Sequence, residues 1–327
     1  MFESVRLQAD IASPDNYELR IMNNELNKPI VVIGSSNTDM VIRVKHLPAP
    51  GETIMGHDFM TNQGGKGANQ AVAVSRLGGQ AAFVARVGDD GFGRQTIQLL
   101  HEEGIDTTHV HTTEGVSTGV ALIPVDDRGE NSIIVASGAN ALLSEEDIEA
   151  ARPMIARAGT VLMQLETPIP TLVRAARIAH EAGACVVLNP APFPPEPLPA
   201  ELLQCLDLIT PNETEASMMS GVQVKDEATA LEAIRAIQAQ GVQRVILTAG
   251  SKGAYTEEGG QLICIPSFKV TAVDTTAAGD TFNGALCVAL SEGQPLSDAI
   301  RFANKAASIS VTRMGAWRSI PRRVELS

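Results

Sequence analysis

The sequence has few cysteines, few aromatic residues and no long apolar run. Its four cysteines, among 327 residues, show no C-x-x-C spacing, so neither a disulfide framework nor a zinc cluster is indicated. No apolar segment is long enough to span a bilayer, and the N-terminus lacks the basic start and apolar centre of a secretory signal. We therefore expect a cytoplasmic protein with no membrane partner.

Basic residues are also in the minority. The chain has 25 Lys and Arg against 38 Asp and Glu, which gives a formal net charge of −13. Nucleic acids and anionic membranes usually bind a basic surface, so this balance argues against both partners. Hydrophobic residues make up 44% of the chain, which is enough to bury a substantial core.

Short β-branched runs alternate with amphipathic helical patterns after Lys28. The runs predict buried strands at 30–34, 81–88, 160–165, 184–189, 207–211 and 244–250. The patterns between them predict helices that include 67–78, 144–159 and 170–183. This alternation is typical of an α/β fold, and it predicts a doubly wound, mostly parallel central sheet with helices on both faces.

Two segments interrupt this alternation, residues 38–62 and 117–136. Each resembles short strands joined by a turn with no helix between them, which predicts a small antiparallel sheet that serves as a lid, a dimer surface or both. We expect residues 29–327 to form one domain that includes this sheet. Residues 1–28 are polar and lack periodicity, so they predict a flexible N-terminal extension.

The stretch "AVDTTAAGDTFNGAL", residues 272–286, indicates chemistry at the start of a helix. Ala277, Ala278 and Gly279 are nearly bare backbone, and N–H groups at a helix N-terminus attract phosphate. Asp280 follows in the same turn, where a carboxylate can take the proton from an attacking alcohol. The alternative is that Asp280 only stabilises the helix dipole, and this stretch alone favours that alternative.

A second glycine motif, "NQGGKGANQA", covers residues 62–71. Lys66 is not followed by Ser or Thr and the first glycine is misplaced, so this is not a Walker A loop. A glycine cluster with Lys66 and Asn69 can bind a polyol through backbone N–H and amide groups. A tight turn from a strand into a helix explains the same glycines equally well.

Six motifs follow one another along the chain in a characteristic order: "SSNTDM", "GGKGANQA", "MQLETP", "TPNETE", "TAGSKGA" and "DTTAAGDTFNGAL". With this order and spacing, the chain resembles the ribokinase-like family of carbohydrate kinases from about Ile30 to Pro321. The resemblance implies ATP-dependent phosphorylation of the 5-hydroxyl of D-ribose, with Mg²⁺ as cofactor and a monovalent cation such as K⁺ as activator.

The resemblance also implies roles for individual residues. Asp280 is the expected catalytic base and Ala277, Ala278 and Gly279 form the expected anion hole. The expected sugar-binding residues are Asn37, Thr38, Asp39, Gly65, Lys66, Gly67, Ala68, Asn69 and Glu166, together with Asp280.

For the nucleotide, the resemblance assigns a triphosphate contact to Asn212 and Mg²⁺ and phosphate handling to Glu215. The same spacing fits a helix N-cap with a capping-box acid, which the residues alone favour. The loop Thr248, Ala249, Gly250, Ser251, Lys252 and Gly253 is expected under the phosphates and ribose of ATP, beside Gly279 and Asp280. Asn304 is expected on the adenine side.

The resemblance places a K⁺ site on Asp274 and Thr276, with Ser310, Arg313, Gly315 and Ser319 contributing mainly carbonyl oxygens. Hard oxygen ligands suit such a cation, which would lie beside the anion hole. Trp317 and Arg318 depart from the family pattern, which usually has a smaller polar residue and proline there.

The acceptor is expected to be ribose because a nucleoside needs an aromatic platform for its base. Phe59 is the one aromatic residue in 37–63, and 115–136 contains none. Two alternatives stay open: a kinase for 2-deoxyribose or another small sugar, and a non-catalytic sugar-binding regulator on the same fold. A homodimer formed through the lid sheets is also expected.

Overall fold

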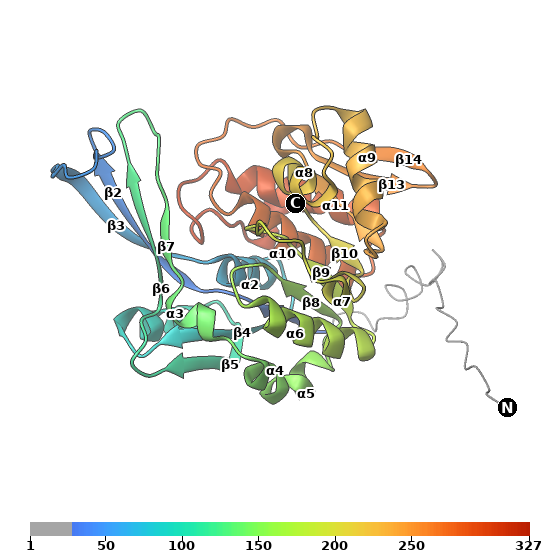
Figure 1. Cartoon of the computed structure of the whole chain (residues 1–327), viewed down its shortest axis with the longest axis horizontal. Coiled ribbons are helices and arrows are strands. Elements are labelled where there is room, and N and C mark those ends of the chain that lie inside the picture. Colours follow the sequence, from blue (N-terminus) through green and yellow to red (C-terminus); the bar gives the residue numbers. More distant parts are fainter. Residues whose placement is uncertain (1–27) are drawn as a thin grey trace.

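The structure, a computed structural model, describes residues 28–327. Its centre is a seven-stranded sheet in the order β11-β10-β9-β8-β1-β4-β5, and all neighbouring strands run parallel (Figure 1). The strands are β1 (Ile30–Ile33), β4 (Ala81–Gly88), β5 (Asp106–Thr113), β8 (Thr160–Met163), β9 (Cys185–Leu188), β10 (Leu208–Ile209) and β11 (Arg244–Val245). The predicted N-terminal extension lies outside the described residues apart from Lys28.

Helices cover both faces of this sheet, because its strands are apolar on both sides. In β1, Ile30 and Val32 belong to one buried cluster and Val31 and Ile33 to another, and none of the four side chains is exposed. The first cluster packs under α2 (Lys66–Arg76), α3 (Gly91–Glu102), α10 (Ala278–Ser291) and α11 (Leu296–Ser310). The second packs under α4 (Glu145–Ala150), α5 (Arg152–Ile155), α6 (Ile169–Glu181), α7 (Ala200–Leu203), α8 (Glu213–Ser220) and α9 (Glu227–Gln238). The predicted fold class is confirmed.

Two predicted elements are divided in the structure. The helix expected over 144–159 is two helices, α4 and α5, because Pro153 has no N–H to donate back into α4. The strand expected over 244–250 is β11 in the central sheet and then β12 (Leu247–Thr248) in a second sheet. β12 pairs antiparallel with β13 (Ala254–Glu258), which pairs with β14 (Gln261–Ile265). Short 3₁₀ turns complete the fold: η1 (Gly138–Leu142), η2 (Gly250–Lys252) and η3 (Arg323–Leu326).

A third, four-stranded sheet stands to one side of the body (Figure 1). Its order is β3-β2-β6-β7, with β2 (Asn37–Val44), β3 (Gly56–Gly64), β6 (Gly119–Val125) and β7 (Ile134–Ala136). The outer pairs are antiparallel, but β2 and β6 run parallel. Because β2 leaves β1 after only three residues, this small sheet begins at the carboxyl edge of the central sheet.

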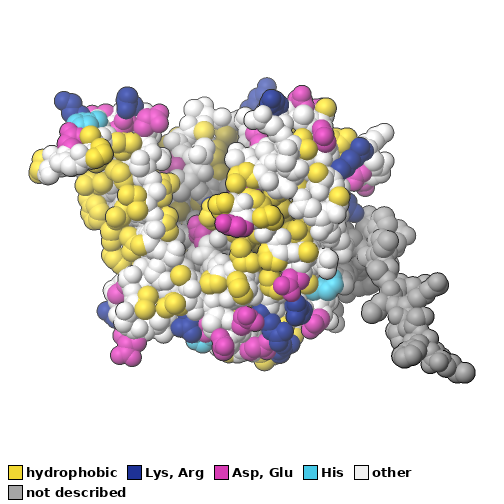
Figure 2. All heavy atoms as spheres, viewed as in Figure 1, with side chains coloured by type: hydrophobic (Ala, Val, Ile, Leu, Met, Phe, Trp, Pro, Cys, Tyr) yellow, Lys and Arg dark blue, Asp and Glu magenta, His cyan; other side chains and the backbone are white. Residues whose placement is uncertain are grey.

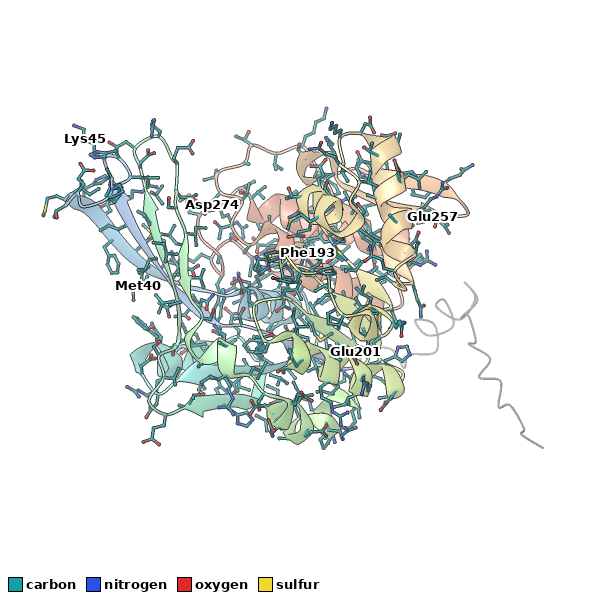
Figure 3. The ribbon with its side chains drawn as sticks, viewed as in Figure 1. Met40, Lys45, Phe193, Glu201, Glu257 and Asp274 are labelled. Carbon is teal, nitrogen blue, oxygen red and sulfur yellow. The ribbon has the colours of Figure 1, made fainter. Side chains whose placement is uncertain are left out.

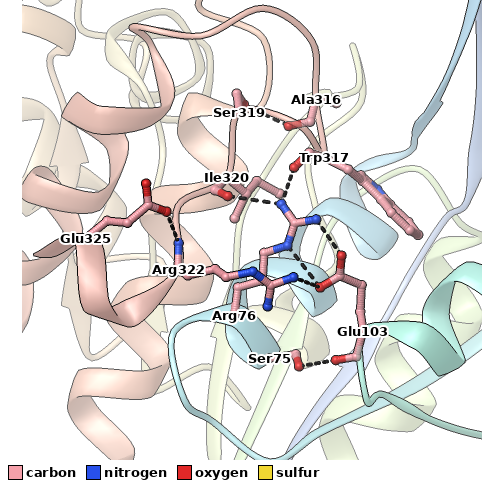
Figure 4. Close-up of polar contacts among 9 residues, drawn as sticks. All are labelled: Ser75, Arg76, Glu103, Ala316, Trp317, Ser319, Ile320, Arg322 and Glu325. Atoms are coloured by element: carbon pink, nitrogen blue, oxygen red, sulfur yellow. Dashed lines mark hydrogen bonds and ion pairs between the residues drawn. The ribbon is translucent and has the colours of Figure 1, made fainter.

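The C-terminal segment is fixed to the end of α2 by Arg76 (Figure 4). The Arg76 guanidinium donates to the carbonyl oxygens of Trp317 and Ile320, and it forms a bidentate ion pair with Glu103. Both charged side chains are largely buried, with exposed fractions of 14% and 13%. Arg322 adds a second pair to Glu103, at 3.5 Å. Trp317, which departs from the family pattern, is buried in the core cluster that also contains the apolar residues of α2 and α10.

No helix among residues 28–327 is both long and apolar enough to cross a membrane. The expected cytoplasmic location stays a prediction.

We expect Arg76→Met to lower the free energy of unfolding by about 3 kcal/mol, because it leaves Glu103 partly unpaired and two carbonyl groups without a donor. Arg76→Lys should lose less, since it keeps the charge but not the planar fork. Urea unfolding followed by circular dichroism measures both. Arg94→Met is the control, because the ion pair of Arg94 with Asp89 is exposed and should contribute less than about 1 kcal/mol. Equal losses for Arg76→Met and Arg94→Met would contradict the anchoring role.

Candidate active site

The two glycine motifs meet at Asp280, in the first turn of α10. Asn69 Nδ2 donates to Asp280 Oδ2 at 2.8 Å, and Gln70 Nε2 donates to Asp280 Oδ1 at 2.9 Å. The carboxylate is only 6% exposed, and both donors lie on α2. A buried carboxylate needs such donors, because it has left its hydration shell. The helix α2, which starts within the glycine motif at 62–71, therefore supplies the hydrogen-bond donors to the expected base. We call this motif the sugar motif, because the expected sugar-binding residues Lys66 and Asn69 belong to it.

A glycine on α10 permits this contact. Gly284 lies one helical turn after Asp280, and a Cβ there would come within 2.5 Å of Ala73 Cβ and 3.0 Å of the Gln70 carbonyl oxygen. Any side chain at this position would push α2 and α10 apart. Gly284 thus keeps Asp280 within reach of the two α2 amides.

The glycines of the second motif lie against the backbone of the segment that follows β1. A Cβ on Gly65 would lie 2.6 Å from Asn37 N, and one on Gly67 would lie 2.6 Å from Ser35 N. Gly65 also has a φ of 85°, which only glycine adopts without strain. The motif is therefore a tight strand-to-helix turn that seats α2 on the segment after β1, and this packing places Lys66 and Asn69 beside Asp280.

Charged side chains gather around this helix start. Glu166, after β8, accepts the Ser35 hydroxyl and the Lys66 backbone N–H, the latter at 3.0 Å. Burial raises the pKa of Asp39 to about 7, aided by the negative charges of Glu166 and Asp280 and opposed by Lys66. Burial lowers the pKa of Lys66, but the negative charges of four nearby carboxylates outweigh burial and raise this pKa overall. The carboxylates are those of Asp280, Glu166, Glu215 and Asp39. The ammonium group is thus held charged among four carboxylates.

Several buried polar atoms at the same place have no partner within the described residues. They include Asn69 Oδ1, Ser36 Oγ and Thr38 Oγ1. Asn37 Oδ1 accepts Asn140 Nδ2 at 2.8 Å, and Asn140 also bonds both backbone groups of Ser36. Buried polar atoms are rarely left unpaired without a reason, and hydroxyl groups of a polyol would satisfy them. Sequence reasoning missed Ser36 and Asn140, because single Ser and Asn residues carry no spacing signal.

The expected anion hole has an unusual backbone. Ala277 adopts a left-handed conformation with φ 58°, the one positive φ outside glycine in residues 28–327. Such a conformation is strained for alanine and is held in place by its surroundings. The Ala278 N–H donates to the Thr275 carbonyl at 3.2 Å, whereas the N–H groups of Ala277 and Gly279 have no acceptor among the described residues. Two of the three expected donors are thus free to bind an anion.

The expected nucleotide residues come together at the ends of β10 and β12. Asn212 caps α8 and forms a complete capping box with Glu215, so the structural alternative for this pair is realised. Asn212 also forms a β-bridge with Thr248, and Lys252 pairs with Glu213 at 2.9 Å. Burial raises the pKa of Glu215, although its bond to Asn212 and the charge of Lys66 act against this.

Asn304 lies apart from this group and is 5% exposed. Its Nδ2 donates to the carbonyl oxygens of Ile265 and Pro266, at 3.0 and 3.3 Å. In this structure its amide fixes the end of β14 against α11.

The expected cation-binding loop is closed by Asp274, which lies on the connection to α10, on the side that faces the small sheet (Figure 3). Its Oδ1 accepts the Thr276 N–H at 2.9 Å, and its Oδ2 accepts the Gly315 N–H at 2.8 Å. Burial raises the pKa of Asp274, but the hydrogen bonds to Thr276 and Gly315 together lower it by more. The pKa of Asp274 is therefore below its usual value. Ser310 and Ser319 bond nearby carbonyls, and Arg313 pairs with Glu325.

Comparisons with known proteins agree with this geometry. Residues 27–323 match the family described as pfkB family carbohydrate kinase. The chain is 47% identical over 300 residues to a ribokinase of Haemophilus influenzae, covering 92% of this chain and 97% of that protein. It is 36% identical to a deoxyribokinase of Salmonella typhi, covering 89% and 95%. An Arabidopsis thaliana ribokinase solved with ribose and ATP superposes with a TM-score of 0.85 at 34% identity, covering 92% and 98%.

The raised pKa of Asp39 predicts a pH dependence of stability. Asp39 ionises near pH 4 in the unfolded chain and near pH 7 in the folded chain. Between these two values the unfolded state binds fewer protons than the folded state. The free energy of unfolding therefore falls as pH rises through this range. Asp39→Asn should remove this loss and gain about 2 kcal/mol on the wild type between pH 4.5 and 8, after discounting for solvent screening.

Urea unfolding across this pH range measures the effect of Asp39→Asn. Asp58→Asn is the matched control, because Asp58 is an exposed carboxylate on β3 of the same sheet. Parallel curves for the wild type and Asp39→Asn would show that burial does not hold Asp39 protonated.

Proposed function

Because the chain belongs to the pfkB family of carbohydrate kinases, we propose that it transfers the γ-phosphoryl group of ATP to the 5-hydroxyl of D-ribose. One observation carries this proposal: Asp280 is buried at the start of α10 and receives a hydrogen bond from each of two neighbouring amides of the sugar motif. The base and the sugar-binding helix therefore form one unit. A pure sugar-binding regulator would have no need of a carboxylate beside free helix N–H groups.

The reaction is an in-line displacement. Asp280 accepts the proton of the sugar alcohol as the alcohol oxygen attacks the γ-phosphorus, and the bond from phosphorus to the ADP oxygen breaks. The free N–H groups of Ala277 and Gly279 stabilise the negative charge that spreads over the transferred group. Closure of the small sheet over the sugar would exclude water and limit wasteful hydrolysis of ATP.

Ribose is the acceptor that the binding residues suit best. The unpartnered oxygens of Ser36, Thr38 and Asn69 and the carboxylate of Asp39 offer hydroxyl partners. Phe59 is the one aromatic side chain in residues 37–63, and it is 63% exposed, so a nucleoside base finds no stacking platform there. 2-Deoxyribose is the nearest rival, since a deoxyribokinase is 36% identical to this chain. A higher kcat/KM on deoxyribose or adenosine than on ribose would refute this choice.

We propose that ATP binds at the ends of β10 and β12, beside α8 and η2. Asn212, Glu215 and residues 248–253 are the proposed phosphate and ribose contacts, and Mg²⁺ would arrive with the phosphates. Glu215 suits this role because it is partly buried and only one of its carboxylate oxygens is used in the capping box. Mg²⁺ prefers few protein ligands and several phosphate and water oxygens. Asn304 stays a proposed contact on the adenine side.

We propose K⁺ as activator, in the loop closed by Asp274. Carboxylate and backbone carbonyl oxygens suit a hard monovalent cation, and Asp274, Thr276, Ser310, Arg313, Gly315 and Ser319 would supply them. Asp274 bonds both Thr276 and Gly315, so it brings the two halves of the loop together beside Ala277. The bound cation would supply positive charge behind the anion hole.

We further propose that two copies pair through the small sheet. The register places Met40, Ile42, Phe59, Leu122 and Ile134 on one face, and the last four are 37 to 64% exposed. Figure 2 shows apolar side chains gathered over this sheet. An apolar patch on a thin sheet is typical of a protein interface, and a second copy of the same patch would bury it.

Asp280→Asn should lower kcat for ribose phosphorylation by about 10³-fold, because the amide keeps the geometry but cannot accept the proton. Ribose binding, measured by calorimetry, should change little. Asp298→Asn is the control, because Asp298 is the exposed first-turn acid of the neighbouring helix α11. If Asp280 only stabilised the helix dipole, both variants would keep near-normal turnover.

Ile134→Lys should convert the dimer to a monomer at micromolar concentration, because it buries a charge in the apolar face of each copy. Sedimentation velocity measures the change. Met218→Lys, at an exposed apolar residue on α8, should leave the dimer intact. A wild-type protein that sediments as a monomer, or an Ile134→Lys variant that stays dimeric, would contradict the proposed interface.

A further inference from the structure

A chain of buried polar side chains runs along the carboxyl edge of the central sheet beneath α10. None of its members is more than 7% exposed, and they come from the segments after β8, β9 and β10 and from α2 and α10: Gln164, Gln70, Asn189, Thr210 and Asn283. None of them has an expected role from the sequence motifs. Burying five polar side chains is costly unless their hydrogen bonds are satisfied, and these bonds form one connected network.

Gln70 is the junction of this amide chain. Its Nε2 donates to Asp280 Oδ1 at 2.9 Å and to Asn189 Oδ1 at 3.1 Å, so both amide hydrogens face an oxygen. Its Oε1 accepts Gln164 Nε2 at 2.6 Å. If the Gln70 amide were reversed, its oxygen would face two other oxygens and its nitrogen would face a donor. The three bonds therefore fix the orientation of the amide that touches the base.

The other end of the amide chain reaches the anion hole. Asn189 Nδ2 donates to the Thr210 carbonyl at 3.4 Å, and the Thr210 hydroxyl donates to Asn283 Oδ1 at 2.6 Å. Asn283 Nδ2 then donates to the Gly279 carbonyl at 2.8 Å. The same network thus contacts both Asp280 and Gly279. It fixes their positions relative to the carboxyl ends of β8, β9 and β10.

We propose that Gln70 is a positioning residue for phosphoryl transfer, which holds the Asp280 carboxylate in place through a neutral hydrogen bond whose direction Gln164 enforces. This inference rests on the proposed function with Asp280 as base. A neutral donor suits this position, because a cation there would stabilise the ionised carboxylate so strongly that it would accept a proton poorly. One donor on each oxygen of Asp280 leaves lone pairs for the sugar hydroxyl.

Two charged groups also face Asp280, and neither belongs to the amide chain. They are Lys66 on α2 and Asp39 on β2, and the negative charge of Asp280 raises the pKa of both. Glu166 and Glu215 act on Lys66 in turn. A substitution at Gln70 leaves all four groups in place, so a change in the acid limb of the kcat profile would be caused by the group that replaces the Gln70 amide.

The test is Gln70→Glu, which keeps the shape of the side chain and replaces the donor to Asp280 with a second carboxyl group. The acid limb of the kcat against pH profile should move to higher pH by about one unit or more, and kcat at pH 7 should fall at least about tenfold. KM for ribose should stay within about threefold, because Gln70 is fully buried. Gln238→Glu on α9, which loses a similar amide bond to a carbonyl, is the matched control.

An unshifted profile for Gln70→Glu overturns the proposal. If that variant fails to fold, Gln164→Met decides, because it removes the donor that orients Gln70 and touches neither Asp280 nor the sugar site. A fall in kcat of about fivefold or more with KM unchanged supports the proposal, and wild-type kinetics overturns it. The proposed function is tested separately. An active Asp280→Asn variant refutes the role of Asp280 as base. An inactive Asp280→Asn variant together with an unshifted pH profile for Gln70→Glu refutes only the role of Gln70.

Discussion

The site depends on the contact between two helices that begin at opposite ends of the sequence. Asn69 and Gln70 on α2 each donate to one oxygen of Asp280 on α10, so each oxygen of that buried carboxylate has a partner. The contact exists because Gly284 lets the two helices approach until a single Cβ would clash. A longer side chain at this position would separate Asp280 from its donors, and α2 would then lose its contact with the start of α10.

The arrangement of the central sheet explains why these groups meet where they do. β1 lies between β4 and β8, so the chain winds outward from β1 in both directions, and the carboxyl ends of the strands on either side of such a point form a natural crevice. The turn after β1 seats the start of α2, and the segment after β8 supplies Glu166 to the Lys66 N–H. The small sheet rises from the same edge, which brings Asp39 over the same crevice. Rigid strand ends thus position a site whose residues lie mainly on β2 and at the starts of α2 and α10.

Much of this was predictable from the sequence, because parallel strands and their helices carry strong periodic signals. The bare backbone before Asp280 at a helix start indicated an anion hole and a base, but the resemblance assigned these roles and they stay proposals. Three features could not be predicted. β5 is polar enough to lack a strand pattern, so only its pairing with β4 makes it a strand. The glycines before Lys66 indicate a close approach, but only the fold shows that the neighbour is the chain itself. Gln70 and Gln164 are separated by 94 residues, and no spacing rule joins two such amides.

We propose that a single helix start, that of α10, both binds the phosphate and activates the alcohol. A crystal structure with ribose and a non-hydrolysable ATP analogue would test this proposal. We expect the ribose 5-oxygen within hydrogen-bonding distance of an Asp280 carboxylate oxygen, roughly 3 Å, and the γ-phosphate facing the Ala277 and Gly279 N–H groups. A 5-oxygen that bonds Glu166 or Asp39 instead, with the γ-phosphate away from α10, would contradict it.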